Sequence, residues 1–131
     1  MKLISKEWLN SAKSDLLLIE QIISKDYLTH MVAFHCQQCV EKSLKALLEH
    51  YEEKIPKIHS INKLYDLNKN RINVDDLTVI NLLDELYIES RYPGDFGLLP
   101  NGKPTLDEAK EFYDFAKLVY GKVRSLVNGN R

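Results

Sequence analysis

Five segments of this chain carry apolar residues at intervals of three or four positions, which is the repeat of one helix face. They span approximately residues 5–24, 27–51, 60–68, 75–91 and 105–127. No segment has a convincing strand pattern, in which apolar and polar residues alternate. Because such helices bury their apolar faces against one another, we expect an all-α antiparallel up-down bundle of about five helices with a four-helix-bundle-like core.

Residues that favour helix ends support these boundaries. Ser5 is the expected N-cap of the first helix, and Ile4 and Leu9 occupy the positions of a hydrophobic staple. Thr105 and Glu108 form a capping-box pattern before the last helix. The preceding residues 92–104 contain three prolines and three glycines, which predicts a loop of a length that is often functional.

Each helix is expected to bury one apolar stripe. In the second helix this stripe lies opposite Gln38 at 100° per residue. The predicted core of the first two helices and the last comprises Trp8, Ala12, Leu16, Ile19, Ile23, Val32, Cys36, Val40, Ser43, Leu44, Leu47, Ala109, Phe112, Ala116, Val119 and Val123. The third and fourth helices are expected to add Ile61, Leu64, Tyr65, Leu67, Leu77, Ile80, Leu83, Leu86 and Tyr87.

Length and charge limit what the chain can do. Its 131 residues fit a single domain over 1–131, with residues 128–131 frayed. A net charge of −1 argues against binding nucleic acid by bulk charge, so any anion site must be local. The N-terminus does not resemble a signal peptide, and no apolar run approaches the ~18 residues of a membrane span. We therefore expect a cytoplasmic protein that does not enter the membrane.

The two cysteines, Cys36 and Cys39, match a C-x-x-C pattern in the wrong context for redox chemistry. They lie inside a helix on its apolar side, whereas a redox pair stands at a helix N-terminus after a strand. Zinc would need further ligands, and the four histidines provide no second pair with ligand spacing. We expect both cysteines to pack in the core, with no metal and no other cofactor.

The second helix also carries a polar face, which consists of His35, Gln38, Lys42, Lys45 and Glu49, with Glu41 beside it. One interpretation is an ordinary solvated surface with an ion pair between Glu41 and Lys45. The other is a ligand site in which the lysines contact phosphate and Gln38 provides hydrogen bonds. Spacing alone favours solvation.

Two further candidates stand near helix ends. His59 precedes the third helix, where a histidine is more often a structural hydrogen-bonding group than a catalyst. Arg91 lies four residues after Tyr87, and Pro93 ends the fourth helix there. The helix dipole favours a cation at this end, and a guanidinium can also bind a phosphate. The sequence leaves these two roles of Arg91 open.

Together these motifs resemble the HEPN domain family. The resemblance rests on Trp8 and Asp15-Leu16, on FHCQQCVEKSLKALL, on the histidine of KIHSINKL, on the arginine of ESRYP and on the acidic start of the last helix. It implies a five-helix up-down bundle that commonly dimerises and that is often fused to, or encoded beside, a minimal nucleotidyltransferase, in some cases as a toxin–antitoxin pair. It also implies a nucleotide-binding role, for which the matching positions are Gln38, Glu41, Lys42, Lys45, His59, Arg91 and Tyr92.

One departure from the family pattern concerns catalysis. The ribonuclease branch has an arginine followed by a histidine after four to six residues, and Phe96, Gly97 and Leu98 occupy that window here. No imidazole is present there for proton transfer, so we expect no catalytic residue. The favoured hypothesis is a non-catalytic module that dimerises and binds a nucleotide, a co-encoded nucleotidyltransferase, or both. The alternatives are a metal-independent ribonuclease toxin of atypical architecture, with Arg91 on the RNA phosphate and His59 as acid/base, and a purely structural helical dimer.

Overall fold

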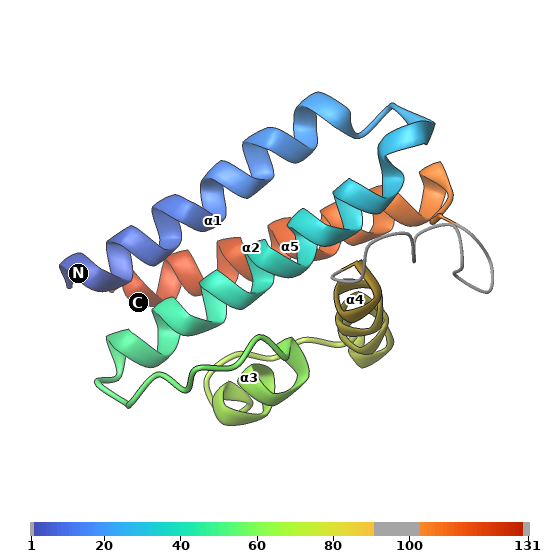
Figure 1. Ribbon diagram of the computed structural model, residues 1–131. Coiled ribbons are helices and arrows are strands. Elements are labelled where there is room, and N and C mark those ends of the chain that lie inside the picture. The colour runs from blue at the N-terminus through green and yellow to red at the C-terminus, as the bar shows by residue number, and fades with distance from the viewer. Residues whose placement is uncertain (1, 91–102, 130–131) are drawn as a thin grey trace.

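The computed structural model describes residues 2–90 and 103–129 (Figure 1). They form α1 (Leu3–Ile22), the short 3-10 helix η1 (Asp26–Leu28), α2 (Thr29–His50), α3 (Ile61–Asn68), α4 (Leu77–Ser90) and α5 (Leu106–Val127). No strand occurs in these two ranges. The predicted all-α fold is confirmed. None of the helices in the described part of the chain combines the length and apolar character needed to cross a membrane.

The second helix lies at the centre of the bundle. The long helices α1, α2 and α5 lie lengthwise along one another, and α1 runs opposite to both α2 and α5 (Figure 1). α3 and α4 cover α2 on the side away from α1, and α4 crosses the long helices steeply (Figure 1). Because α2 contacts α1, α3, α4 and α5, polar as well as apolar parts of its surface are covered.

Most of the predicted helix ends are present. The Thr105 hydroxyl accepts a hydrogen bond from the Glu108 amide at 3.0 Å, and the Glu108 carboxylate accepts one from the Thr105 amide at 2.9 Å, which confirms the capping box. Ser60 caps α3 by accepting from the Lys63 amide at 3.2 Å. Asp76 accepts from the Val79 amide at 3.3 Å at the start of α4.

The predicted start of the first helix is wrong. α1 begins at Leu3, so Ser5 lies within the helix and does not cap it. Its side chain is fully buried against α2, where the hydroxyl donates to the Ala46 carbonyl at 3.2 Å. A buried hydroxyl needs such a partner, and tertiary contact therefore decides the role of Ser5. Ile4 is 46% exposed, so no hydrophobic staple forms.

The core follows the predicted stripes of the long helices. Every predicted core residue of α2 and α5 is buried, as are Ala12, Leu16 and Ile19 of α1. The prediction is wrong for Leu67 and Leu77, which are each 50% exposed. In α3 the buried position after Leu64 is taken by Asn68, whose amide donates to the Leu44 carbonyl at 3.3 Å. A short helix has room for few core positions, and here one of them is polar.

Candidate functional site

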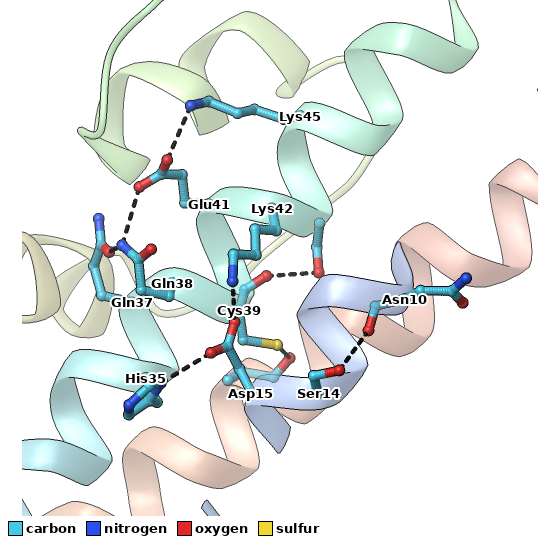
Figure 2. A network of polar contacts seen from close by, with 12 residues as sticks. Asn10, Ser14, Asp15, His35, Gln37, Gln38, Cys39, Glu41, Lys42 and Lys45 are labelled. Carbon is cyan, nitrogen blue, oxygen red and sulfur yellow. Dashed lines mark hydrogen bonds and ion pairs between the residues drawn. The ribbon is translucent and has the colours of Figure 1, made fainter. Parts of the chain in front are cut away.

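Asp15 of α1 lies between two cationic or protonatable side chains of α2 (Figure 2). One of its carboxylate oxygens is 2.9 Å from Nδ1 of His35, and the other is 2.9 Å from Nζ of Lys42. Asp15 is almost fully buried, whereas His35 and Lys42 keep about a fifth of their side-chain surface exposed, at 19% and 22%. We call these three residues the Asp15 cluster. It joins α1 to α2 by charge as well as by packing.

Glu41 organises a second group of side chains, which we call the Glu41 cluster: Gln37, Gln38, Glu41, Lys45 and His59. The Glu41 carboxylate accepts from Nζ of Lys45 at 2.9 Å and from the Gln38 amide at 3.3 Å, and it lies 3.1 Å from Nδ1 of His59. Lys45 also stands 5.5 Å from the centre of the Trp8 ring, a cation–π contact. Figure 2 shows Glu41 connecting Gln38 with Lys45 along α2.

The predicted ion pair between Glu41 and Lys45 is present at 2.9 Å, but the solvated surface expected around it is wrong for these two residues. Both residues are buried, at 4% and 6% exposure, because α2 is covered on several sides. Buried charges of this kind need partners, and each provides the partner of the other. Lys42 and Lys45 are thus bonded to carboxylates within the fold. A ligand contact by either lysine stays a prediction.

His59 connects the Glu41 cluster to the surface. Its backbone carbonyl accepts from the Gln37 side-chain amide at 2.6 Å, and its Nδ1 faces Glu41. About half of its side chain, 53%, is exposed, and its ring lies 5.7 Å from that of Tyr87 on α4. Among the described residues, Nε2 of His59 has no hydrogen-bond partner. Glu41 therefore holds the ring through Nδ1, while half of the side chain is exposed.

A cavity of about 280 Å³ opens beside His59, between the start of α3 and the last turns of α4. His59, Ser60 and Lys63 line one side, and Asp84, Tyr87 and Ile88 line the other. The Tyr87 ring stacks on Phe34 of α2 with 5.5 Å between ring centres. Arg91 and Tyr92, which follow α4 directly in sequence, lie outside the described residues.

Asp84 fixes the wall of this cavity. Its carboxylate accepts from the Ser60 hydroxyl at 3.1 Å and from the amides of Ile61 and Asn62 at 2.9 and 3.0 Å. These amides are the unsatisfied donors of the first turn of α3, where a negative charge is also favoured by the helix dipole. A carboxylate of α4 thereby caps α3 and fixes the segment that carries His59.

Replacing Asp84 by alanine is expected to lower the free energy of unfolding by about 1–2 kcal/mol, because the amides of α3 lose their acceptor. Urea denaturation measures this change. Asn81→Ala is the control: Asn81 bonds the same Asn62, but through an exposed side-chain contact, and should change the value by less than about 0.5 kcal/mol. Equal effects of the two substitutions would contradict a capping role for Asp84.

The cysteines do not contribute a nucleophile to this site. Both are fully buried, which confirms their predicted place in the core. Burial raises the pKa of Cys39 to about 12 and raises that of Cys36 well above its ordinary value. Since the thiolate is the reactive form, both thiols are chemically inert at neutral pH. In the described part of the chain, no three His, Cys, Asp or Glu residues are grouped as a metal site would require.

Several residues of the site were not among the predicted ones, namely Asp15, Gln37, Lys63 and Asp84. Asp15 carried a signal, because a charged residue inside the apolar stripe of Ala12, Leu16 and Ile19 must find a buried partner. No sequence signal identifies Gln37, because its partner is the backbone carbonyl of His59 in a distant segment. Lys63 and Asp84 become neighbours of one cavity only through the packing of α3 on α4.

Comparisons with known proteins agree with the fold. A family model of the HEPN domain matches residues 5–126. The structure is similar to that of TT1696 from Thermus thermophilus, with a TM-score of 0.72, 26% identity and coverage of 92% of this chain and 96% of that one. It is also similar to ST0689, described as an archaeal HEPN homologue, with a TM-score of 0.70, 26% identity and coverage of 97% and 99%. A comparison with curated proteins gave no match.

Proposed function

Because the chain belongs to the HEPN domain family, we propose that it is a non-catalytic module that dimerises and binds a nucleotide in the cavity between α3 and α4. One observation carries the nucleotide proposal. A single cavity is lined by the half-exposed imidazole of His59, the ammonium group of Lys63 and the aromatic ring of Tyr87. Arg91 follows Tyr87 by four residues in sequence.

Each of these groups suits one part of a nucleotide. An aromatic ring stacks on a base whatever the base is, at about 1–3 kcal/mol per stack. Lys63 provides a point charge and Arg91 a planar fork for phosphate oxygens, with Tyr92 beside it. His59 can hydrogen-bond through Nε2 while Glu41 holds Nδ1. In this proposal Gln38, Glu41 and Lys45 form the polar network that holds His59, and Lys42 stays bonded to Asp15.

Titration with ATP and GTP by calorimetry tests the nucleotide proposal. Lys63→Ala is expected to weaken binding at least about tenfold, which corresponds to about 1.4 kcal/mol. Lys69→Ala is the matched control, because Lys69 follows α3, pairs with Asp66 and is not in the cavity wall. Absence of binding by the folded protein, or equal loss in both variants, would reject the cavity as a nucleotide site.

The proposed partner is a co-encoded minimal nucleotidyltransferase, as part of a toxin–antitoxin-like pair, and the proposed assembly is a homodimer. Family membership supports both proposals. Sedimentation of the purified chain tests the dimer, and co-purification with a transferase encoded in the adjacent reading frame tests the partner. A chain that is monomeric at all concentrations would reject the homodimer. Failure to co-purify with the transferase would reject the partner.

The ribonuclease alternative keeps one supporting observation. His59 is half exposed and contacts Tyr87, which lies in the last turn of α4 before Arg91. Growth arrest on expression that is abolished by Arg91→Ala and by His59→Ala would favour this alternative. Harmless expression together with intact RNA after long incubation would remove it.

A further inference from the structure

A second and larger hollow lies on another part of the molecule, between α5 and the connection from α3 to α4. It measures about 550 Å³ and shares no residue with the cavity beside His59. We call it the α5 groove. Its lining includes Arg71 and Asn73 of the connection and Lys117, Leu118, Gly121 and Lys122 of α5.

The charge of the α5 groove differs from that of the whole chain. The chain has one more acidic than basic residue, yet the lining includes three cationic side chains and no carboxylate. Arg71 is paired with Glu53 and stacks on Tyr51, so its charge is balanced. Lys117 stands 5.8 Å from the centre of the Tyr113 ring and Lys122 donates to the Asn73 carbonyl, but within the described ranges neither lysine forms an ion pair. Two positive charges without a carboxylate partner among the described residues therefore flank the α5 groove.

The floor of the α5 groove is formed by an apolar residue, Leu118, and by Gly121, which has no side chain. Leu118 is 51% exposed, and a side chain added at Gly121 would meet nothing within 4 Å. Lys122 donates to the Asn73 carbonyl at 2.7 Å, so the two walls are joined at that point. From Lys117 to Leu126 the lining extends about 14 Å along α5, which is longer than the distance of about 10.5 Å from i to i+7 on a second helix.

These features favour one class of occupant. An amphipathic helix binds such a groove with apolar side chains at i, i+3, i+4 and i+7, and acidic flanks would pair with the two lysines. A small anion would gain little from Lys117, which is exposed to water, and Lys122 already donates to the Asn73 carbonyl. A two-fold contact with a second copy would bring the same cationic surfaces together. We propose that the α5 groove binds an acidic, amphipathic helical segment of another protein.

A designed probe tests this proposal with the full chain. The probe is a fluorescein-labelled peptide helix with leucines at i, i+3, i+4 and i+7 and glutamates at the flanks, and a matched peptide has lysines in place of the glutamates. We expect only the glutamate peptide to bind, with a micromolar Kd by fluorescence anisotropy. The double variant Lys117→Glu with Lys122→Glu should weaken this binding at least about tenfold and gain binding to the lysine peptide. Lys110→Glu, on an exposed position of α5 outside the lining, should change neither.

Gly121→Phe tests the position independently of charge. A Cβ atom at Gly121 would meet nothing within 4 Å, and thermal unfolding checks that the larger phenyl ring leaves the fold intact. Gly121→Phe should fill the α5 groove and reduce peptide affinity at least about tenfold, and it should leave nucleotide binding intact. Conversely, Lys63→Ala should leave peptide binding intact.

Three results would overturn the proposal. The first is equal affinity for both peptides, or no binding at about 1 mM. The second is self-association of the chain that Gly121→Phe abolishes, which would assign the α5 groove to a second copy. The third is displacement of the glutamate peptide from the wild-type chain by inorganic pyrophosphate with an inhibition constant no higher than the Kd of the peptide, which would assign the α5 groove to small anions.

Discussion

Glu41→Ala is expected to lower the free energy of unfolding by about 3–5 kcal/mol, the largest loss among the substitutions considered. The change leaves the ammonium group of Lys45 buried, with 8% of the side chain exposed, and without its carboxylate. It also removes the contact to Nδ1 of His59 and one of the two acceptors of the Gln38 amide, the other being the Gln37 side-chain oxygen at 2.7 Å. The cation–π contact with Trp8 is too weak to replace a carboxylate at a desolvated site. Urea denaturation at constant m-value measures the loss.

The matched control is an ion pair with the same spacing at the surface. Lys110 and Asp114 are also four residues apart on a helix, at 3.2 Å, but their side chains are 70% and 59% exposed. Asp114→Ala should therefore cost less than about 0.5 kcal/mol. A second variant separates charge from shape: in Glu41→Ala with Lys45→Met, the unpaired charge is absent, so part of the stability should return. Equal losses for Glu41→Ala and Asp114→Ala would show that the Glu41 cluster is effectively solvated.

Loss of the Glu41 carboxylate should also affect the neighbouring cavity. Glu41 holds the ring of His59, while Gln37 holds its backbone carbonyl. If nucleotides bind beside His59, Glu41→Gln should lower the affinity for nucleotides, although Lys63 and Tyr87 are unchanged. Unchanged nucleotide affinity in a folded Glu41→Gln protein would separate the stabilising role of Glu41 from the binding site.

Asp15→Ala is expected to lower the free energy of unfolding by about 2–3 kcal/mol. The carboxylate is the shared partner of His35 and Lys42 and the polar link between α1 and α2. The expected loss is smaller than for Glu41 because His35 and Lys42 reach solvent and can be partly rehydrated. Thermal or urea unfolding measures the change.

The neighbouring Ser14 provides the control for Asp15. Its hydroxyl bonds the Asn10 carbonyl within the same helix at 3.2 Å and makes no link to α2 in the described contacts. Ser14→Ala should alter stability by less than about 0.5 kcal/mol. In Asp15→Ala with Lys42→Met, the unpaired ammonium is removed, so stability should partly recover. No recovery would indicate that packing of Asp15, not its charge, accounts for the loss.

The long helices could be predicted because their evidence is local. Apolar spacing indicated the buried stripes of α2 and α5, and Thr105 with Glu108 indicated where α5 begins. Predictions failed where a neighbouring helix changes the role of a residue. Ser5 has the residue type of an N-cap, but α2 offers it the Ala46 carbonyl. Asn68 takes a core position because Leu44 provides a partner for its amide.

The sequence by itself determined the fold class and the family signature, because helix periodicity and motif order are properties of the chain alone. Only the tertiary structure decided what the polar face of α2 does. A helical repeat cannot distinguish a polar face covered by other helices from one covered by water, since both have the same spacing. The packing of α1 and α3 on opposite sides of α2 pairs Lys42 with Asp15 and brings His59 to Glu41. A surface that spacing indicated to be solvated is therefore, at Glu41 and Lys45, a buried network of charges.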